Sequence, residues 1–235
     1  QGFDKVKEGA DFKHLPSGSL GVHDEYMFTQ FKDELNELPQ PFMSALFTIS
    51  SHSPYDFPDE HKLSFNSKHD EYVNSVAYTD KCLGNFMKSV KDENWYDNTL
   101  FVIVADHSHN SPLKRRVAQK EKFHIPMIWF GEVLNDKYKG GKSANFASHI
   151  DIAPTILRQM DINVDNDYFG GDIFGNNSGF IFYCFGSGYG MIKKDGNSAF
   201  SIKYNKFIES NFNDSSIVSE AEMFLQYSFD RYLNY

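Results

Sequence analysis

An aspartate and two histidines stand at the end of an apolar run in the middle of the chain. Residues 100–104 read Leu-Phe-Val-Ile-Val, and Asp106, His107 and His109 follow. A carboxylate next to an imidazole supplies a hard oxygen and a borderline nitrogen, which together suit a divalent metal ion. An Asp-His pair in a surface turn that caps a helix has the same sequence. The doublet alone therefore leaves metal binding and a structural turn both open.

His52 occupies a comparable place after another apolar run, residues 42–50. Continuous apolar runs of this length are typical of strands buried on both faces of a parallel sheet. Open α/β sheets bind their ligands beyond the carboxyl ends of such strands. If the strands 42–50 and 100–105 are parallel neighbours, His52 and His107 project from the same edge. A histidine that caps the turn after the strand is the alternative for His52.

The remaining histidines have weaker sequence support. His149 lies just before Asp151, where a helix is expected to begin, so a supporting or capping role is predicted for it. His124 begins a strand, and a structural role is expected. The others lie in polar segments with no supporting pattern: His14, His23, His61 and His69.

Hydrophobic periodicity predicts an alternating α/β order over the first two thirds of the chain. Helices are predicted over 24–38, 68–90 and 152–160. Buried strands are predicted over 42–50, 100–105 and 125–130. Beyond Gly170, short strands separated by glycine turns indicate an antiparallel meander, over 180–185, 190–193 and 200–207. A last helix is expected to start near Ser219, which has capping-box spacing to Glu222.

Composition excludes some classes of function. The formal net charge of −9 argues against nucleic-acid binding, and Lys114–Arg116 is the only dense basic run in the sequence. The 235 residues, 40% of them hydrophobic, fit an ordinary globular core, and no apolar segment is long enough to span a bilayer. Cys82 and Cys184 match neither a disulfide framework nor a zinc motif, and Cys82 is expected to be a buried free thiol.

Six segments of the chain resemble the motifs of a known family. They are SSHSPY, NTLFVIVADHSH, HIPMIWFG and SHIDIAPTIL, with GVHDEYMF upstream and GGDIFGNNSGFIFYCFGSGYGMI downstream. Together they resemble the alkaline phosphatase and sulfatase superfamily, in particular the lipoteichoic acid synthase-like phosphoglycerol transferases. The resemblance covers nearly the whole chain. It implies an α/β fold with a mainly parallel sheet flanked by helices, a C-terminal antiparallel meander and a final helix. Residues 1–170 would be the C-terminal part of the α/β catalytic domain, and 171–235 its antiparallel strands and terminal helix.

The resemblance also implies roles for the site residues. Asp106 and His107 would be metal ligands, and His52 would bind substrate near the transferred phosphoryl group. His109 and His149 are candidates for supporting positions behind these ligands. The implied cofactor is a divalent metal, with manganese or zinc favoured over magnesium or calcium. The related pattern has glycine after Asp-His where this chain has Ser108-His109, which leaves room for an extra ligand or a different metal.

The resemblance places a threonine nucleophile and an acidic ligand ahead of the region that matches Gln1. The threonines of this chain all fall in predicted helix, strand or capping contexts. The chain is therefore expected to be the C-terminal half of a catalytic domain, without a certain catalytic nucleophile. Its expected partner is its own N-terminal half, which would carry membrane helices.

The implied function is a metal-dependent phosphoryl-group transferase or hydrolase that acts on a phosphate or sulfate ester, with lipid-linked esters among the candidates. A sulfatase or phosphoethanolamine transferase of the same superfamily is one alternative. A non-catalytic binding or structural module that kept the fold is the other. The expected location is the extracytoplasmic face of a bacterial-type membrane or the periplasm, with a membrane tether elsewhere in the protein.

Overall fold

The chain forms two compact units. The computed structural model describes residues 2–59, 63–110, 112–163, 169–175, 179–211 and 216–234. Unit 1 comprises Gln1–Val102 and Ile128–Asp136, and unit 2 comprises Ile103–Met127 and Lys137–Tyr235. Both helices and sheets are present, so the fold is mixed α/β, as the sequence predicts.

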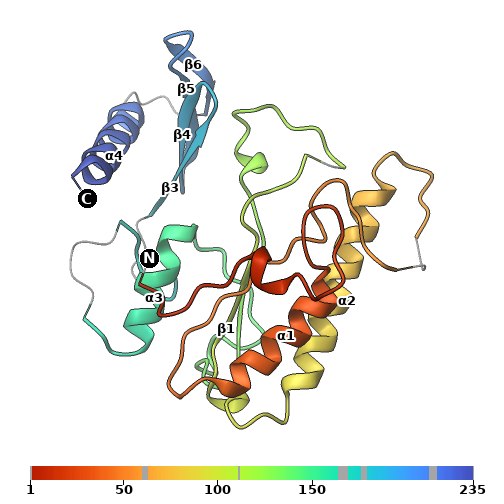
Figure 1. The fold of residues 1–235 in the computed structure, drawn as a ribbon. Helices are drawn as coiled ribbons and strands as arrows, with labels where there is room; N and C mark the ends of the chain where they lie inside the picture. Colours follow the sequence, from red (N-terminus) through yellow and green to blue (C-terminus); the bar gives the residue numbers. More distant parts are fainter. Residues whose placement is uncertain are drawn as a thin grey trace. The chain divides into compact units, whose positions relative to one another are not determined.

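Two long helices form the core of unit 1. Helix α1 (Asp24–Glu37) packs against α2 (Asp70–Val90), as Figure 1 shows. Apolar residues that recur every three or four positions place one stripe of each helix in the interface. The buried residues of this core are Phe28, Leu35, Tyr78, Cys82, Phe86, Val90 and Trp95. Both predicted helices are confirmed, with ends within two residues of the expected ones.

The other elements before the antiparallel sheet are short. The described residues include four 3-10 helices, η1 (Gly9–Phe12), η2 (Tyr96–Asn98), η3 (Lys120–Lys122) and η4 (His149–Asp151). Strands β1 (Phe101–Val104) and β2 (Met127–Phe130) pair in a two-stranded sheet. The strands predicted over 100–105 and 125–130 are therefore confirmed. Their predicted burial is wrong, because the residues of β1 are half-buried and Ile128 of β2 is 52% exposed.

The segment 42–50 is not a strand, which corrects the sequence prediction. Phe42 and Leu46 pack against the core of unit 1, whereas Met43 and Phe47 are 72% and 73% exposed. An apolar run acquires strand structure only when a neighbouring strand supplies hydrogen bonds to its backbone. In the described residues this run has no such ladder, so it remains an extended segment with one apolar side in solvent.

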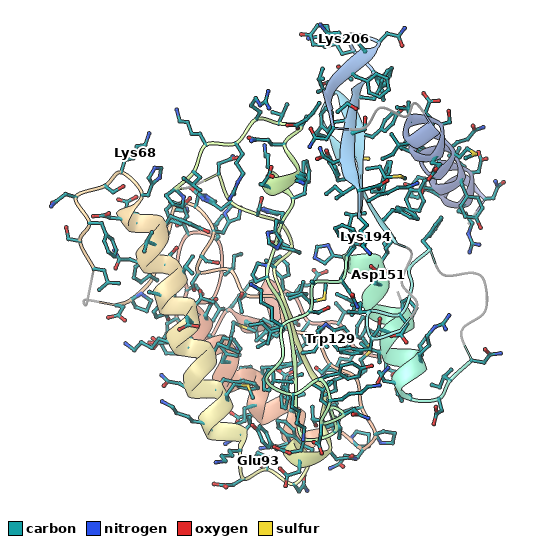
Figure 2. The ribbon with its side chains drawn as sticks, turned by 180° about the vertical axis from the view of Figure 1, so that it is seen from behind. Lys68, Glu93, Trp129, Asp151, Lys194 and Lys206 are labelled. Carbon is teal, nitrogen blue, oxygen red and sulfur yellow. The ribbon has the colours of Figure 1, made fainter. Side chains whose placement is uncertain are left out.

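Unit 2 contains a four-stranded antiparallel sheet. Its strands are β3 (Phe180–Phe185), β4 (Gly188–Lys193), β5 (Gly196–Ser201) and β6 (Lys206–Ser210), in that order across the sheet. Lys194 and Lys206 lie at opposite ends of this sheet in Figure 2. The predicted meander is confirmed, but the single strand expected over 200–207 is wrong. The chain turns between β5 and β6, with Asn205 in the left-handed region at φ +48°, which an asparagine side chain tolerates.

Both faces of this sheet are covered. Helix α4 (Ser216–Leu233) packs on β4 and β5 through Ile217 and Ala221, which contact Tyr189 and Met191 (Figure 1). Residues on the opposite face, Tyr183 and Ala199, form a second cluster with Ala118. Alternation of side chains along each strand produces the two faces.

The glycine at position 190 makes room for a ring on that second face. A Cβ at Gly190 would lie 2.2 Å from Cζ of Tyr183, its partner across the β3–β4 pair. Helix α3 (Ile152–Gln159) completes the unit, and α4 begins three residues before the expected Ser219.

Two further findings bear on the sequence analysis. None of the helices within the described ranges has both the length and the apolar character needed to cross a bilayer. Cys82 is a free thiol in the core of unit 1, as predicted, and burial raises its pKa to about 11. The thiol is therefore neutral at physiological pH.

The exposed side chains of Met43 and Phe47 generate a prediction about association. An exposed apolar run with unpaired backbone groups is a site for pairing with another chain. We expect the 235-residue polypeptide to self-associate, and the double variant Met43→Ser/Phe47→Ser to be monomeric in sedimentation velocity. The control is Met223→Ser/Tyr232→Ser on α4, which removes exposed apolar side chains of unit 2. A monodisperse wild-type monomer at high concentration would contradict the prediction.

Candidate active site

His52 lies in a tight turn that lines a small pocket of unit 1. The N–H of His52 donates to the Ile49 carbonyl oxygen at 3.0 Å, and the His52 carbonyl accepts from the N–H of Tyr55 at 2.9 Å. The imidazole is exposed, and its Nδ1 lies 2.7 Å from the Ser53 carbonyl oxygen. Because a carbonyl oxygen only accepts, Nδ1 carries the hydrogen of this bond. Nε2 is then the ring nitrogen that would meet a ligand.

The wall of the same pocket contains His23 and Asp56. His23 is buried, and Asp56 Oδ2 accepts from Ser19 N–H at 3.0 Å and from the Ser19 hydroxyl at 3.2 Å. A Cβ at Gly18 would lie 2.7 Å from Asp56 Oδ2 and 2.8 Å from His23 Cε1, so only glycine allows this close approach. His23 is not among the site residues predicted from the sequence. The signal that could have identified it is its position directly before α1, whose first residue is Asp24.

Asp106 and His107 lie together in unit 2, directly after β1. Asp106 Oδ1 accepts from the N–H of His107 at 2.8 Å, and Asp106 Oδ2 lies 3.5 Å from His107 Nε2. Nδ1 of His107 lies 3.0 Å from the Ser108 carbonyl oxygen and therefore carries the hydrogen of that bond. In the neutral ring, Nε2 is left with a free lone pair beside the carboxylate. When the ring is protonated, the same geometry makes an ion pair.

This geometry fits a divalent metal ion. Ligand atoms at 2.0–2.2 Å from a tetrahedral ion lie about 3.4 Å apart, close to the 3.5 Å between Nε2 and Oδ2. A hydrogen bond from the other ring nitrogen to a carbonyl is the usual way in which a metal-binding histidine is oriented. In the part of the chain that the structure describes, no group of three metal-binding side chains is found. Asp106 and His107 are thus two donor groups, fewer than the three or four protein ligands of a typical zinc site.

His149 contacts the backbone next to this pair. Its Nε2 lies 2.7 Å from the carbonyl oxygen of Ala105, the residue before Asp106. The short helix that carries His149 is held by Asp151, which is 1% exposed and lies at the start of α3 (Figure 2). Asp151 accepts from Ser148 N–H and from Gly171 N–H, both at 2.7 Å. His149 thus lies in a position to fix the end of β1.

Ser108, which stands where the family resemblance predicts glycine, uses its hydroxyl to hold the loop. The hydroxyl donates to the Lys122 carbonyl oxygen, so the residue after the doublet is tied to η3. His109 is half-buried in the same loop. Ser108 therefore makes a side-chain hydrogen bond to Lys122 that a glycine at this position could not make.

The loop beyond Ser108 is also anchored to the antiparallel sheet. The Tyr183 hydroxyl donates to the Ala118 carbonyl oxygen at 2.9 Å, and the Tyr183 ring lies 4.4 Å from that of Phe123. Arg116 forms an ion pair with Glu209 of β6 at 3.0 Å. The meander thus helps to hold the loop that follows Asp106 and His107.

Comparison with known proteins assigns the family. The model of the family described as Sulfatase matches residues 1–162. The chain belongs to the sulfatase family. Among curated relatives of this sulfatase-family chain, the lipoteichoic acid synthase-like protein YvgJ of Bacillus subtilis is 28% identical over 199 residues, which cover 73% of this chain and 31% of YvgJ. The lipoteichoic acid synthase of Staphylococcus aureus (strain USA300) is 26% identical, over 66% of this chain and 26% of that protein.

Two solved structures are similar to this chain in fold. A protein of the alkaline phosphatase superfamily from Vibrio parahaemolyticus has a TM-score of 0.80 and 25% identity, over 99% of this chain and 60% of that one. The lipoteichoic acid synthase LtaP from Listeria monocytogenes has a TM-score of 0.65 and 21% identity, over 93% of this chain and 61% of that one. The sulfatase-family chain thus has the alkaline phosphatase superfamily fold. It spans about a third or less of the curated relatives that it matches.

The contact between Tyr183 and Ala118 predicts a stability effect in this sulfatase-family chain. Burial raises the pKa of Tyr183 well above its ordinary value, so the phenol stays a neutral donor. Tyr183→Phe leaves the Ala118 carbonyl without this donor and should lower the free energy of unfolding by about 1–3 kcal/mol. It should also speed tryptic cleavage at Lys114–Arg116. The measurements are urea denaturation and limited proteolysis.

Tyr189→Phe is the matched control. The hydroxyl of Tyr189 donates to Glu222 at 2.9 Å in a partly buried site, where water can replace it. Its loss should cost less stability and leave the tryptic cleavage rate unchanged. Equal effects of the two variants would show that the Tyr183 contact does not hold the loop.

Proposed function

We propose that this chain supplies the metal ligands and the substrate-binding histidine of a metal-dependent phosphoryl-group transferase or hydrolase, similar to the phosphoglycerol transferases. The observation that carries the proposal is the pair of donors after β1. In a sulfatase-family chain, a carboxylate oxygen of Asp106 and Nε2 of His107 lie 3.5 Å apart, at the separation expected of two ligands on one ion.

Asp106 and His107 hold the metal in this proposal, with manganese or zinc favoured by a carboxylate and imidazole donor set. A bound divalent ion supplies charge neutralisation at phosphoryl oxygens and a lowered pKa for a nucleophilic hydroxyl. The chain's own contribution is orientation. Ser108 carbonyl fixes the His107 ring, and His149 holds the carbonyl of Ala105 next to Asp106.

His52 binds the phosphoryl group of the substrate in this proposal. Its Nδ1 hydrogen is directed to the Ser53 carbonyl, so its Nε2 is the nitrogen for substrate. When the ring is cationic, Nε2–H donates to a phosphoryl oxygen or to the leaving-group oxygen. In the neutral ring, the same Nε2 accepts a proton.

The nucleophile comes from outside these 235 residues in this proposal. The chain has five threonines. Four of their hydroxyls donate to acceptors within 2.9 Å, those of Thr29, Thr79, Thr99 and Thr155. A hydroxyl held in this way by a main-chain carbonyl or a buried carboxylate is not presented to a ligand. The preceding part of the protein, with membrane helices, is the proposed source and partner.

The names of the curated relatives favour a lipid-linked phosphodiester as substrate, at the extracytoplasmic face of a membrane or in the periplasm. The match to the Sulfatase family makes a sulfate ester the second candidate. Turnover of bis(p-nitrophenyl) phosphate and of p-nitrophenyl sulfate by the full-length protein separates the two. Faster hydrolysis of the sulfate ester would overturn the phosphoryl assignment.

The metal assignment predicts a joint loss of metal and turnover. In the full-length protein, Asp106→Ala should abolish turnover and remove the bound divalent metal, because the carboxylate is one of its ligands. The measurements are turnover of the phosphodiester and metal content by mass spectrometry. Asp195→Ala, in the exposed turn between β4 and β5, is the control and should keep both. The isolated chain should bind metal weakly, since it supplies part of the ligand set. Tight stoichiometric metal in the isolated chain, or full metal content in Asp106→Ala, would contradict the assignment.

The assignment of His52 predicts loss of turnover without loss of metal. His52→Ala should lower turnover of the full-length protein by roughly two to four orders of magnitude, the usual effect of removing one proton-transfer or oxyanion group. Metal content should stay unchanged, and the exposed His14 provides the control variant His14→Ala. Loss of metal from His52→Ala would instead make this histidine a ligand.

A further inference from the structure

A buried carboxylate joins the turn of His52 to both helices of unit 1. The side chain of Asp24, the first residue of α1, is 0% exposed. Its Oδ1 accepts from the N–H groups of Ile49 and Ser50, both at 3.0 Å. Its Oδ2 accepts from the hydroxyl of Thr79, on α2, at 2.6 Å. The N–H of Asp24 in turn donates to Oγ of Ser50 at 3.0 Å. We call these residues and bonds the Asp24 network.

Both oxygens of the Asp24 carboxylate accept hydrogen bonds in this network. A buried carboxylate is tolerated only where hydrogen-bond donors replace the water it has lost. Asp24 has three such donors, and it lies in the first turn of α1, where the helix dipole also favours a negative charge. The Ser50 hydroxyl meanwhile satisfies one of the N–H groups that the start of a helix leaves free. The reciprocal bonds between Asp24 and Ser50 therefore fix this backbone from both sides.

The fixed backbone is that of the turn which carries His52. Ile49 donates its N–H to Asp24, and its carbonyl accepts the N–H of His52. Ser50 lies two residues before His52, and both line the same pocket. The main chain of residues 49–52 thus connects the buried carboxylate of Asp24 to the residue that carries the exposed imidazole, His52.

We propose that Asp24 is a positioning residue for His52, with Thr79 as its support. Asp24 does not touch substrate in this proposal; it sets where the imidazole is held. The inference rests on the proposed role of His52 in turnover. It assigns a functional consequence to a buried residue that the sequence analysis did not single out.

The test uses two conservative variants of the full-length protein. Asp24→Asn keeps the size of the side chain and one acceptor oxygen but removes the charge, and Thr79→Val removes the hydroxyl donor. Each should lower kcat for bis(p-nitrophenyl) phosphate by about 10- to 100-fold, the effect of displacing a catalytic group by a fraction of an ångström to an ångström. The change in KM should be smaller, because the contact is proposed to matter most in the transition state.

Asn74→Ala is the matched control. Asn74 is also buried on α2, and it also holds a loop, through bonds with Leu63 at 2.6 and 2.8 Å. Among the described residues its side chain bonds to Leu63 and Asp70, and not to residues 49–52. Asn74→Ala should lower thermal stability at least as much as Thr79→Val while leaving kcat unchanged. If kcat falls equally in the control, the effect of the Asp24 network is general destabilisation, and the proposal is wrong.

A double-mutant cycle decides whether Asp24 acts through His52. In the background His52→Ala, Asp24→Asn should change kcat by less than about twofold, because the group that it positions is already gone. A full additional loss in that background would mean that Asp24 acts through another residue. Unchanged kcat in Asp24→Asn alone would also overturn the proposal.

An NMR measurement separates failure of this inference from failure of the proposed function. If His52→Ala leaves turnover intact, the proposed role of His52 is wrong. The ring Cε1–H and backbone amide signals of His52 then test positioning directly. They should shift in Asp24→Asn and Thr79→Val and stay in place in Asn74→Ala. Unshifted His52 signals in the first two variants would refute the positioning role independently of any activity.

Discussion

Hydrogen bonds from backbone N–H groups to a buried carboxylate are the interaction on which both units depend. Desolvating a carboxylate costs several kcal/mol unless donors replace the water, roughly the scale of the whole stability of a domain. Asp24 in unit 1 and Asp151 in unit 2 each meet this constraint with two N–H groups. A main-chain N–H group has its position fixed by the backbone of its own segment. Each carboxylate is therefore satisfied in only one arrangement of the neighbouring segments. Each arrangement holds the backbone that leads to a candidate site residue.

The two carboxylates reach the site residues by different routes. Asp24 binds the segment that itself carries His52, so the connection runs along one turn of main chain. Asp151 shapes the short helix of His149, and the His149 ring then meets the carbonyl before Asp106. The second route includes an additional side-chain contact, that of the His149 ring with the Ala105 carbonyl, whereas the first continues from the carboxylate through the main chain alone. Small shifts of backbone at Asp24 are therefore transmitted more directly.

Much of the fold could be predicted from local pattern. Helices α1 and α2 follow from apolar residues at helical spacing, and the meander from short runs between glycines. The Asp106-His107 doublet was identifiable because both residues follow an apolar strand directly in sequence. The strand predicted over 42–50 failed because strand structure needs a ladder partner, which a single run of residues does not reveal. The prediction of a single strand over 200–207 failed because the apolar residues Phe200 and Phe207 flank the turn and pair across it.

The long-range hydrogen bonds of Asp24 and Asp151, which the sequence does not reveal, share a different property. Asp24 bonds to residues 25, 26 and 55 positions away, and Asp151 bonds to a residue 20 positions away. None of these spacings corresponds to a helical or strand period, so no sequence pattern reveals these bonds. An aspartate at a helix start has an ordinary explanation as a favourable charge near the helix dipole. That explanation applies to Asp24, but it gives no indication of the long-range hydrogen bonds that the same carboxylate makes.

Local carbonyl groups select the reactive nitrogen of the candidate histidines. His52 and His107 each direct Nδ1 to the carbonyl of the next residue, which leaves Nε2 for the proposed contact with substrate in one case and with metal in the other. His149 uses Nε2 on a distant carbonyl, so its free nitrogen is Nδ1. A ring nitrogen that bonds to the main chain keeps its proton and cannot bind a metal. The bond to Ala105 therefore makes His149 a support for the Asp106 backbone through Nε2, and any metal contact by this histidine would have to use the opposite edge of its ring.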